Sequence, residues 1–205
     1  MEILSFDISK LTEEDYLKFY ENSTIQRKAK ADRLKFSDDK KRCIIGEVLL
    51  KKALSLYFEK NKIIKDIDLK SFEIKNNKYG KPYIKNLNDF YYNISHSGKY
   101  VVLAFGEKDV GVDVEYIDCG RDEVSLINLA KRYFTEKEKR YVFEDSSLMY
   151  NRFYEIWTGK ESYLKCIGKG ICAGLDSVDV TELWKNGLET RLLDEDYCIS
   201  LFEKK

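Results

Sequence analysis

Residues 110–117 read VGVDVEYI, and this stretch predicts a strand. Apolar and acidic side chains alternate in it, so Val112 and Val114 share one face while Asp113 and Glu115 share the other. The two carboxylates would lie about 7 Å apart along the strand. Two carboxylates on one face can hold a hard cation together, and they can equally form the wet face of an amphipathic strand.

A long helix is predicted downstream, from about residue 147 to residue 167, where Gly168 ends it. Its apolar stripe consists of Phe153, Ile156, Trp157, Leu164 and Ile167. Glu161 falls near this stripe, so its carboxylate needs a cation, a hydrogen-bond network or an edge position. Lys165 follows one turn later in the favourable Glu-to-Lys order, and simple pairing on the helix flank is the alternative explanation.

His96 is the single histidine, and it lies in the stretch NISHSG at residues 93–98. Small polar neighbours and a glycine allow a phosphate to approach the backbone closely, although a lone histidine is also commonly structural. A metal site made only of aspartate and glutamate favours Mg²⁺ or Mn²⁺ over zinc. A basic cluster, which could also be a solvated helix face, adds candidate phosphate partners: Lys28, Lys30, Arg33 and Arg42.

The order of the predicted elements repeats along the chain. Each part reads as a strand, two short helices, one long helix and further strands, with a boundary near residues 107–109. We therefore expect an α+β fold, a pseudo-twofold arrangement of two similar α/β halves, residues 1–108 and residues 109–205. The functional site is expected between these halves.

Local signals place several elements within this plan. Ser37 is the expected cap of the long helix in the N-terminal half. Thr135 and Glu138 form a capping-box pattern in front of a short helix. The residues near 175–182 are expected to form a strand, the first of three at the end of the chain.

Length and composition disfavour several protein classes. The 205 residues, 43% of them hydrophobic, are enough for a substantial core, and 36 basic residues balance 36 acidic ones, which argues against a nucleic-acid binder. The five cysteines form no CxxC, so reduced thiols are expected. The sequence has neither a secretory signal nor the roughly 20 apolar residues of a membrane span, and we expect a cytoplasmic protein without a membrane partner.

Four motifs, in their order and separation, resemble the Sfp-type 4′-phosphopantetheinyl transferase family. They are GKP at residues 80–82, NISHS at 93–97, GVDVE at 111–115 and WTGKESYLK at 157–165. The GxDxE and WxxKES elements are specific as a pair. The motifs are densest between residues 79 and 175, and the order of elements extends the resemblance over nearly the whole chain.

The resemblance implies an enzyme of the holo-[acyl-carrier-protein] synthase type. Such an enzyme transfers the 4′-phosphopantetheine arm of coenzyme A to a serine of an apo acyl or peptidyl carrier protein, with Mg²⁺ as cofactor. Adenosine 3′,5′-bisphosphate is the other product. Residues 1–108 would bind coenzyme A, and residues 109–205 would carry the metal and the chemistry. A monomer is expected, and the carrier could serve fatty-acid, polyketide or nonribosomal-peptide synthesis.

The resemblance also implies roles for the residues around the metal. Asp113, Glu115 and Glu161 match the family's Mg²⁺ ligands. Lys165 matches the lysine near the pyrophosphate, and Glu161, Lys165 and His96 are the implied catalytic residues. Either Glu161 or a metal-bound water would be the general base.

Other residues match the coenzyme A contacts of the family. Ser95 and His96 match contacts to its phosphates, and Arg42 matches the arginine that meets the 3′-phosphate. Lys28, Lys30 and Arg33 fall where the family supplies further basic contacts. The segment against the adenine end is matched by Gly80, Lys81 and Pro82.

Two other functional classes fit parts of the sequence. A metal-dependent nuclease could use the same carboxylates and lysine, but the neutral net charge weighs against it. A non-catalytic binding module for coenzyme A or a carrier protein would not need all three carboxylates. The segment at residues 117–134 matches the region implicated in carrier docking, where acidic carriers would suit Arg121, Lys131 and Arg132.

Overall fold

The computed structural model describes residues 1–62, 68–85, 87–168 and 174–205. The N-terminal half consists of five strands and three α-helices within these residues, and two of the strands form a short hairpin. In chain order they are β1 (Glu2–Asp7), α1 (Glu13–Glu21), α2 (Ile25–Asp32), α3 (Ser37–Lys60), the hairpin β2 (Ile74–Asn76) and β3 (Pro82–Ile84), β4 (Tyr91–Ser97) and β5 (Tyr100–Gly106).

The C-terminal half begins with β6, the strand predicted from VGVDVEYI. Its elements in chain order are β6 (Val110–Tyr116), α4 (Glu123–Tyr133), α5 (Glu136–Phe143), α6 (Met149–Ile167), α7 (Val180–Lys185), β7 (Glu189–Asp194) and β8 (Tyr197–Glu203). Among the described helices, none combines the length and the hydrophobicity that crossing a bilayer requires.

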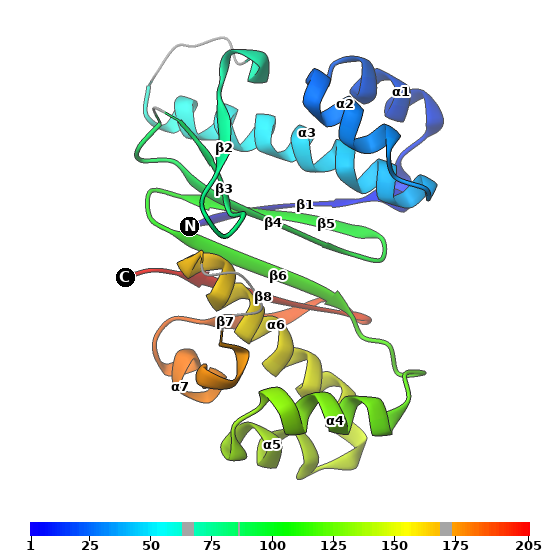
Figure 1. The fold of residues 1–205 in the computed structure, drawn as a ribbon, viewed down its shortest axis with the longest axis vertical. Coiled ribbons are helices and arrows are strands. Elements are labelled where there is room, and N and C mark those ends of the chain that lie inside the picture. The colour runs from blue at the N-terminus through cyan, green and yellow to red at the C-terminus, as the bar shows by residue number, and fades with distance from the viewer. Residues whose placement is uncertain (63–67, 86, 169–173) are drawn as a thin grey trace.

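The two halves repeat one topology. The strand order is β1-β5-β4 in one sheet and β6-β8-β7 in the other, so each sheet places its first strand beside its last. The sheets lie in the middle of the molecule, with α1, α2 and α3 beyond one sheet and α4, α5, α6 and α7 beyond the other (Figure 1). This repeat confirms the predicted α+β fold with two similar halves.

Threonine caps set the start of several helices. The Thr12, Thr24 and Thr135 hydroxyls accept backbone N–H groups of α1, α2 and α5, and Thr135 with Glu138 forms the predicted capping box. The expected Ser37 cap is wrong. Ser37 is the first residue of α3, and Phe36 precedes it without a side-chain cap.

The strand expected near residues 175–182 is also wrong. A 3₁₀ turn over Leu175–Ser177 and the helix α7 occupy this segment. The Asp179 carboxylate accepts the N–H and the hydroxyl of Thr181, which starts a helix at that point. This local cap decides the backbone conformation there.

Three apolar layers hold the molecule together. Helix α3 packs on the outer face of the first sheet, and α6 packs on the outer face of the second. Between the sheets lies a third layer, which joins β5 to β6 and β8. Its fully buried residues are Val102, Ala104, Val110, Val112, Val114 and Ile199. Val112 and Val114 therefore point into the core, and Asp113 and Glu115 lie on the other face of β6, as predicted.

Side chains, not a backbone ladder, join β4 to β6, since these strands belong to different sheets. The Asn93 side-chain oxygen accepts the Val112 N–H at 3.0 Å, and the Ser97 hydroxyl oxygen accepts the Tyr116 N–H at 3.1 Å. We call this contact the β4–β6 seam. It lets polar side chains of β4 and β6 face each other between the two halves.

Gly111 allows α6 to lie directly on β6. A Cβ at this position would lie 1.9 Å from the Ser162 carbonyl oxygen and 2.5 Å from the Cys166 backbone nitrogen. Both atoms belong to the helix backbone, so neither can move without shifting α6. This contact brings the helix residues close to Asp113 and Glu115.

We expect Gly111→Ala to destabilise the protein by about 3 kcal/mol, because the methyl group must push the α6 backbone away from β6. Urea unfolding followed by circular dichroism would measure the loss. Gly120→Ala is the matched control, because the nearest atom to its added Cβ is the Asp118 carboxylate at 3.4 Å. The control should stay within about 0.5 kcal/mol of wild type. Equal stability of the two variants would contradict the close packing described above.

Candidate active site

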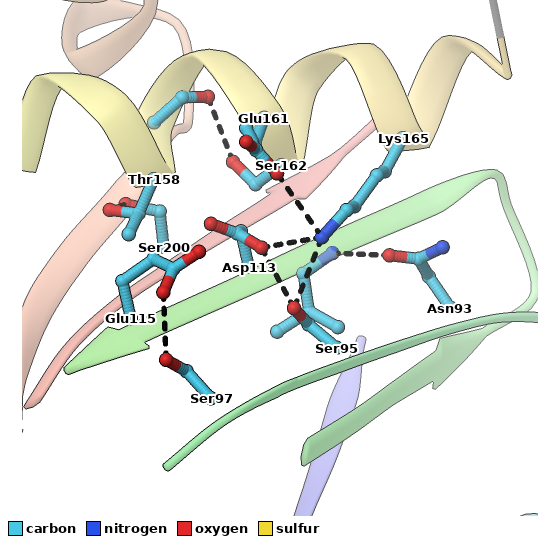
Figure 2. A network of polar contacts seen from close by, with 12 residues as sticks. Asn93, Ser95, Ser97, Asp113, Glu115, Thr158, Glu161, Ser162, Lys165 and Ser200 are labelled. Carbon is cyan, nitrogen blue, oxygen red and sulfur yellow. Dashed lines mark hydrogen bonds and ion pairs between the residues drawn. The ribbon is translucent and has the colours of Figure 1, made fainter. Parts of the chain in front are cut away.

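Three elements bring polar side chains into one region beside the β4–β6 seam. Figure 2 shows Ser95 and Ser97 coming from β4, Asp113 and Glu115 from β6, and Glu161 and Lys165 from α6. Strand alternation accounts for the two strand pairs, and one helical turn separates the helix pair. Six side chains from both halves therefore meet at one place.

Asp113 is the centre of this region and is only 1% exposed. Its Oδ1 accepts the Ser95 hydroxyl at 2.7 Å and also accepts the Lys165 ammonium. Its Oδ2 is buried and has no hydrogen-bond partner among the described residues. A buried carboxylate oxygen without a partner is costly, so this atom is a ready ligand for a cation.

Lys165 contributes the one positive charge that touches these carboxylates in the described structure. Besides Asp113, its ammonium contacts the Ser95 hydroxyl at 3.0 Å and the Glu161 Oε2 at 3.5 Å. Burial lowers the pKa of Lys165, but the charges of Asp113 and Glu161 outweigh this effect and raise it overall. The ammonium thus stays charged and holds Asp113 and Glu161 close together.

Glu161 and Glu115 have raised pKa values for the same two reasons. Burial, followed by the negative charge of Asp113, raises the pKa of Glu161 to about 7, while Lys165 opposes the shift. Burial and Asp113 also raise the pKa of Glu115, whose Oε2 accepts the Ser97 hydroxyl at 2.7 Å. Both carboxylates therefore favour a further positive charge nearby.

These donors fit a divalent hard cation. If all three carboxylates are ionised, they and the one ammonium carry a net charge of about −2, and every available ligand atom is oxygen. Among the described residues, no group of three His, Cys, Asp or Glu side chains has the geometry to hold a metal ion. The Lys165 ammonium lies among the carboxylates instead.

His96 and Arg42 lie on the other side of β4, next to the turn that follows it. His96 is exposed, and partial removal from water together with the charges of Arg42 and Lys165 lowers its pKa. The Arg42 guanidinium donates to the Gly98 carbonyl and pairs with Asp39 at 2.6 Å. Both predicted phosphate contacts are thus close to one turn of the N-terminal half.

The predicted GKP segment lies in the turn that leads into β3. The Lys81 ammonium pairs with Asp109 at 2.9 Å and donates to the Cys166 carbonyl at 2.7 Å, so it links the hairpin to the start of β6 and the end of α6. Gly80 has the positive φ of a turn residue. Lys81 and Pro82 line a cavity of about 460 Å³ together with Asn77, Tyr83, Tyr91 and Tyr92.

The remaining basic residues lie on or next to α2. Lys30 and Arg33 are exposed. The Lys28 ammonium donates to the Glu21 carbonyl at 2.8 Å and lies over the Tyr20 ring. None of these three contacts the region around Asp113 within the described structure, and their role in binding stays a prediction.

Sequence reasoning missed a buried ion pair behind the site. Lys160 and Glu138 are both fully buried and 2.7 Å apart. The Lys160 ammonium also donates to the carbonyls of Leu175 and Val178, and Glu138 accepts the Val180 N–H. Lys160 thereby attaches the segment before α7 to α6. A signal was present, because Lys160 follows Trp157 by three residues and precedes Leu164 by four, which is core spacing.

Comparison with known proteins agrees with this architecture. Residues 109–205 match the sequence profile of the 4′-phosphopantetheinyl transferase superfamily, and residues 12–108 match that of the N-terminal part of 4′-phosphopantetheinyl transferase. The chain is 30% identical over 171 residues to the 4′-phosphopantetheinyl transferase Sfp of Bacillus subtilis (strain 168), which is 83% of this chain and 71% of that protein. This chain belongs to the 4′-phosphopantetheinyl transferase superfamily. The predicted family is thereby confirmed.

Two other relatives in the superfamily extend the comparison. A 4′-phosphopantetheinyl transferase of Bacillus subtilis is 33% identical over 158 residues, covering 76% of this chain and 64% of that protein. The L-aminoadipate-semialdehyde dehydrogenase-phosphopantetheinyl transferase of Rattus norvegicus is 30% identical over 187 residues, covering 82% and 57%. The chain thus spans less than two thirds of the length of these two relatives.

The raised pKa of Glu161 predicts a pH-dependent stability. Its folded-state pKa of about 7 exceeds the ordinary value of 4.5, so the folded protein keeps a proton that the unfolded chain loses between these values. The free energy of unfolding should therefore fall as pH rises from 4.5 to 7, by up to about 3 kcal/mol for this group. Urea unfolding at a series of pH values without metal would measure it. Glu161→Gln should flatten the slope, and identical slopes for both proteins would contradict the assignment.

Proposed function

We propose that the chain transfers the 4′-phosphopantetheine arm of coenzyme A to a serine of an apo carrier protein. This is the holo-[acyl-carrier-protein] synthase type of reaction, and adenosine 3′,5′-bisphosphate is the second product. The observation that carries the proposal is the buried Asp113 Oδ2, which has no partner among the described residues and lies beside Glu161, Lys165 and Ser95. Membership of the superfamily supports the substrate class.

Asp113, Glu115 and Glu161 are the residues that we propose to hold Mg²⁺, with Mn²⁺ as a possible substitute. All three offer carboxylate oxygens, which these ions prefer. When bound, the ion neutralises charge on the pyrophosphate. The net charge of about −2 in this region matches one such ion.

Lys165 and His96 are the residues that we propose to stabilise charge on the phosphates. The serine oxygen of the carrier forms a bond to the β-phosphorus, the bond to the bridging oxygen breaks, and the bisphosphate nucleotide leaves with the bonding electrons. Negative charge accumulates on the leaving group, and the Lys165 ammonium is charged and close to Ser95. The serine proton needs an acceptor, and we propose Glu161 or a metal-bound water for this role.

The N-terminal half is the part that we propose to bind coenzyme A. Ser95 and His96 belong to β4, and Arg42 contacts the turn that follows it. Phosphates bound there would meet a hydroxyl, an imidazole and a guanidinium. The cavity beside Lys81 and Pro82 offers aromatic walls for the adenine end. Further contacts to the 3′-phosphate are proposed for Lys28, Lys30 and Arg33.

Helix α4 and the segment before it form the surface that we propose for the carrier protein. Arg121, Lys131 and Arg132 are exposed there, and Val124 is an exposed apolar residue on the same helix. An acidic carrier would find complementary charge at these three basic side chains. Because both halves of the site belong to one chain, we propose that the protein is a monomer. We also propose that it acts in the cytoplasm.

The proposed transfer can be tested by measuring the mass of the carrier protein. We expect a mass increase of at least one apo carrier, drawn from fatty-acid, polyketide and nonribosomal-peptide systems, after incubation with coenzyme A, Mg²⁺ and this protein. Glu161→Gln should slow transfer by at least about 100-fold, because it removes a charge at the reacting phosphates. Intact-protein mass spectrometry of the carriers measures both results.

A matched control is Glu182→Gln on α7, where an exposed carboxylate pairs only with surface lysines in the described structure. Its transfer rate should equal that of wild type within twofold. No mass increase on any carrier, while an established transferase modifies the same carriers, would overturn the proposed function. Full activity of Glu161→Gln would overturn the assignment of the site.

A further inference from the structure

The turn between β4 and β5 is held from both halves of the molecule. On one side, Arg42 of α3 donates to the Gly98 carbonyl. On the other side, the Tyr197 hydroxyl, at the start of β8, accepts the Lys99 N–H at 3.0 Å. A residue of the C-terminal half therefore sets the backbone of a turn in the N-terminal half.

Gly98 and Tyr197 are in very close contact. Gly98 has φ of +50°, and a Cβ on it would lie 2.1 Å from the Tyr197 hydroxyl oxygen and 3.1 Å from Cζ. No larger residue fits between the turn and the tyrosine without displacing one of them. Tyr197 is itself 5% exposed, so its ring has little freedom to move away.

Aromatic and charged neighbours fix the Tyr197 ring. Its centroid lies 4.9 Å from that of Tyr100 at 89° and 5.3 Å from that of Tyr116. The Lys99 ammonium lies 5.4 Å from the Tyr197 centroid and pairs with Asp194 at 2.9 Å. Because the ring is fixed by its neighbours, its hydroxyl is a rigid acceptor for the Lys99 N–H.

The same turn connects to the groups proposed for phosphate binding. Ser97 begins it and donates to Glu115, His96 directly precedes Ser97, and Arg42 binds the Gly98 carbonyl. A shift of the turn would therefore move the imidazole and the guanidinium together. It would leave Lys165 and Glu161 in place, because those residues are on α6.

We propose that Tyr197 is a positioning residue for coenzyme A. Through its hydrogen bond to Lys99 and its contact with Gly98, it holds the turn so that His96 and Arg42 meet the phosphates of the nucleotide. This inference rests on the proposed function. Because His96 is also proposed to stabilise charge on the phosphates, a displaced turn should weaken nucleotide binding and can lower kcat as well.

The test is Tyr197→Phe, which keeps the ring and removes only the hydroxyl. Losing one hydrogen bond should raise KM for coenzyme A about 3- to 10-fold, and any fall in kcat should be smaller than this rise. The Kd of adenosine 3′,5′-bisphosphate, measured by calorimetry without a carrier protein, should rise by a similar factor. Gly98→Ala should raise both constants as well, because it disturbs the same contact from the other side.

Tyr141→Phe is the matched control. Its hydroxyl donates to Glu155 at 2.6 Å in the C-terminal core, so the substitution removes a comparable hydrogen bond away from the turn. It should lower the urea midpoint and leave KM and Kd within twofold of wild type. An unchanged Kd in Tyr197→Phe, or a fall in kcat with unchanged KM, would overturn the proposal. If the wild type modifies no carrier, the Kd comparison still tests the role of Tyr197, and the transfer result tests the function separately.

Discussion

Asp113 is a carboxylate buried between the two halves of the molecule. It needs hydrogen-bond or charged partners from both halves. Leaving an ionised side chain in an apolar interior without compensation costs several kcal/mol. The N-terminal half meets this need with Ser95, and the C-terminal half meets it with Lys165. Side chains from β4 and α6 therefore meet at this one group of β6, and its second oxygen still has no partner in the described structure.

The surroundings of Asp113 explain why its neighbours titrate unusually. Apolar layers lie on the far sides of both sheets and between them, so charges near the β4–β6 seam are poorly screened. Burial and mutual repulsion raise the pKa of Glu161 and of Glu115, while the same negative charges raise the pKa of Lys165. One environment thus favours a proton on acids and on the base alike, which is the behaviour of a site that lacks positive charge.

The sequence predicted those features of the site that depend on the periodicity of one strand or one helix. Alternation in residues 110–117 correctly separated Val112 and Val114 from Asp113 and Glu115, and helical spacing correctly placed Glu161 one turn from Lys165. Contacts between distant segments were not predictable in this way. Local patterns contain no information about the partners of Lys160 or about the ion pair of Lys81 with Asp109.

Two local predictions failed for a different reason. The sequence suggested a strand near residues 175–182, yet the Asp179 cap and the Lys160 bonds to the carbonyls of Leu175 and Val178 hold a turn and a helix there. Ser37 has the right chemistry for a cap but lies one residue inside α3. Near residues 175–182, an adjacent cap and tertiary hydrogen bonds outweighed a weak intrinsic preference.

The direct contact between β4 and β6 also bears on how the chain reaches its native state. Ser95 and Asp113 are only 18 residues apart in sequence, so bringing them together closes a short loop. Each sheet, by contrast, is completed by strands from opposite ends of its half, as Glu2 pairs with Phe105 and Val110 with Glu203. The polar contact between β4 and β6 therefore costs less loop-closure entropy than the strand pairing that completes either sheet. Because β4, β5 and β6 follow one another in the chain, we expect them to come together before the end strands of either half.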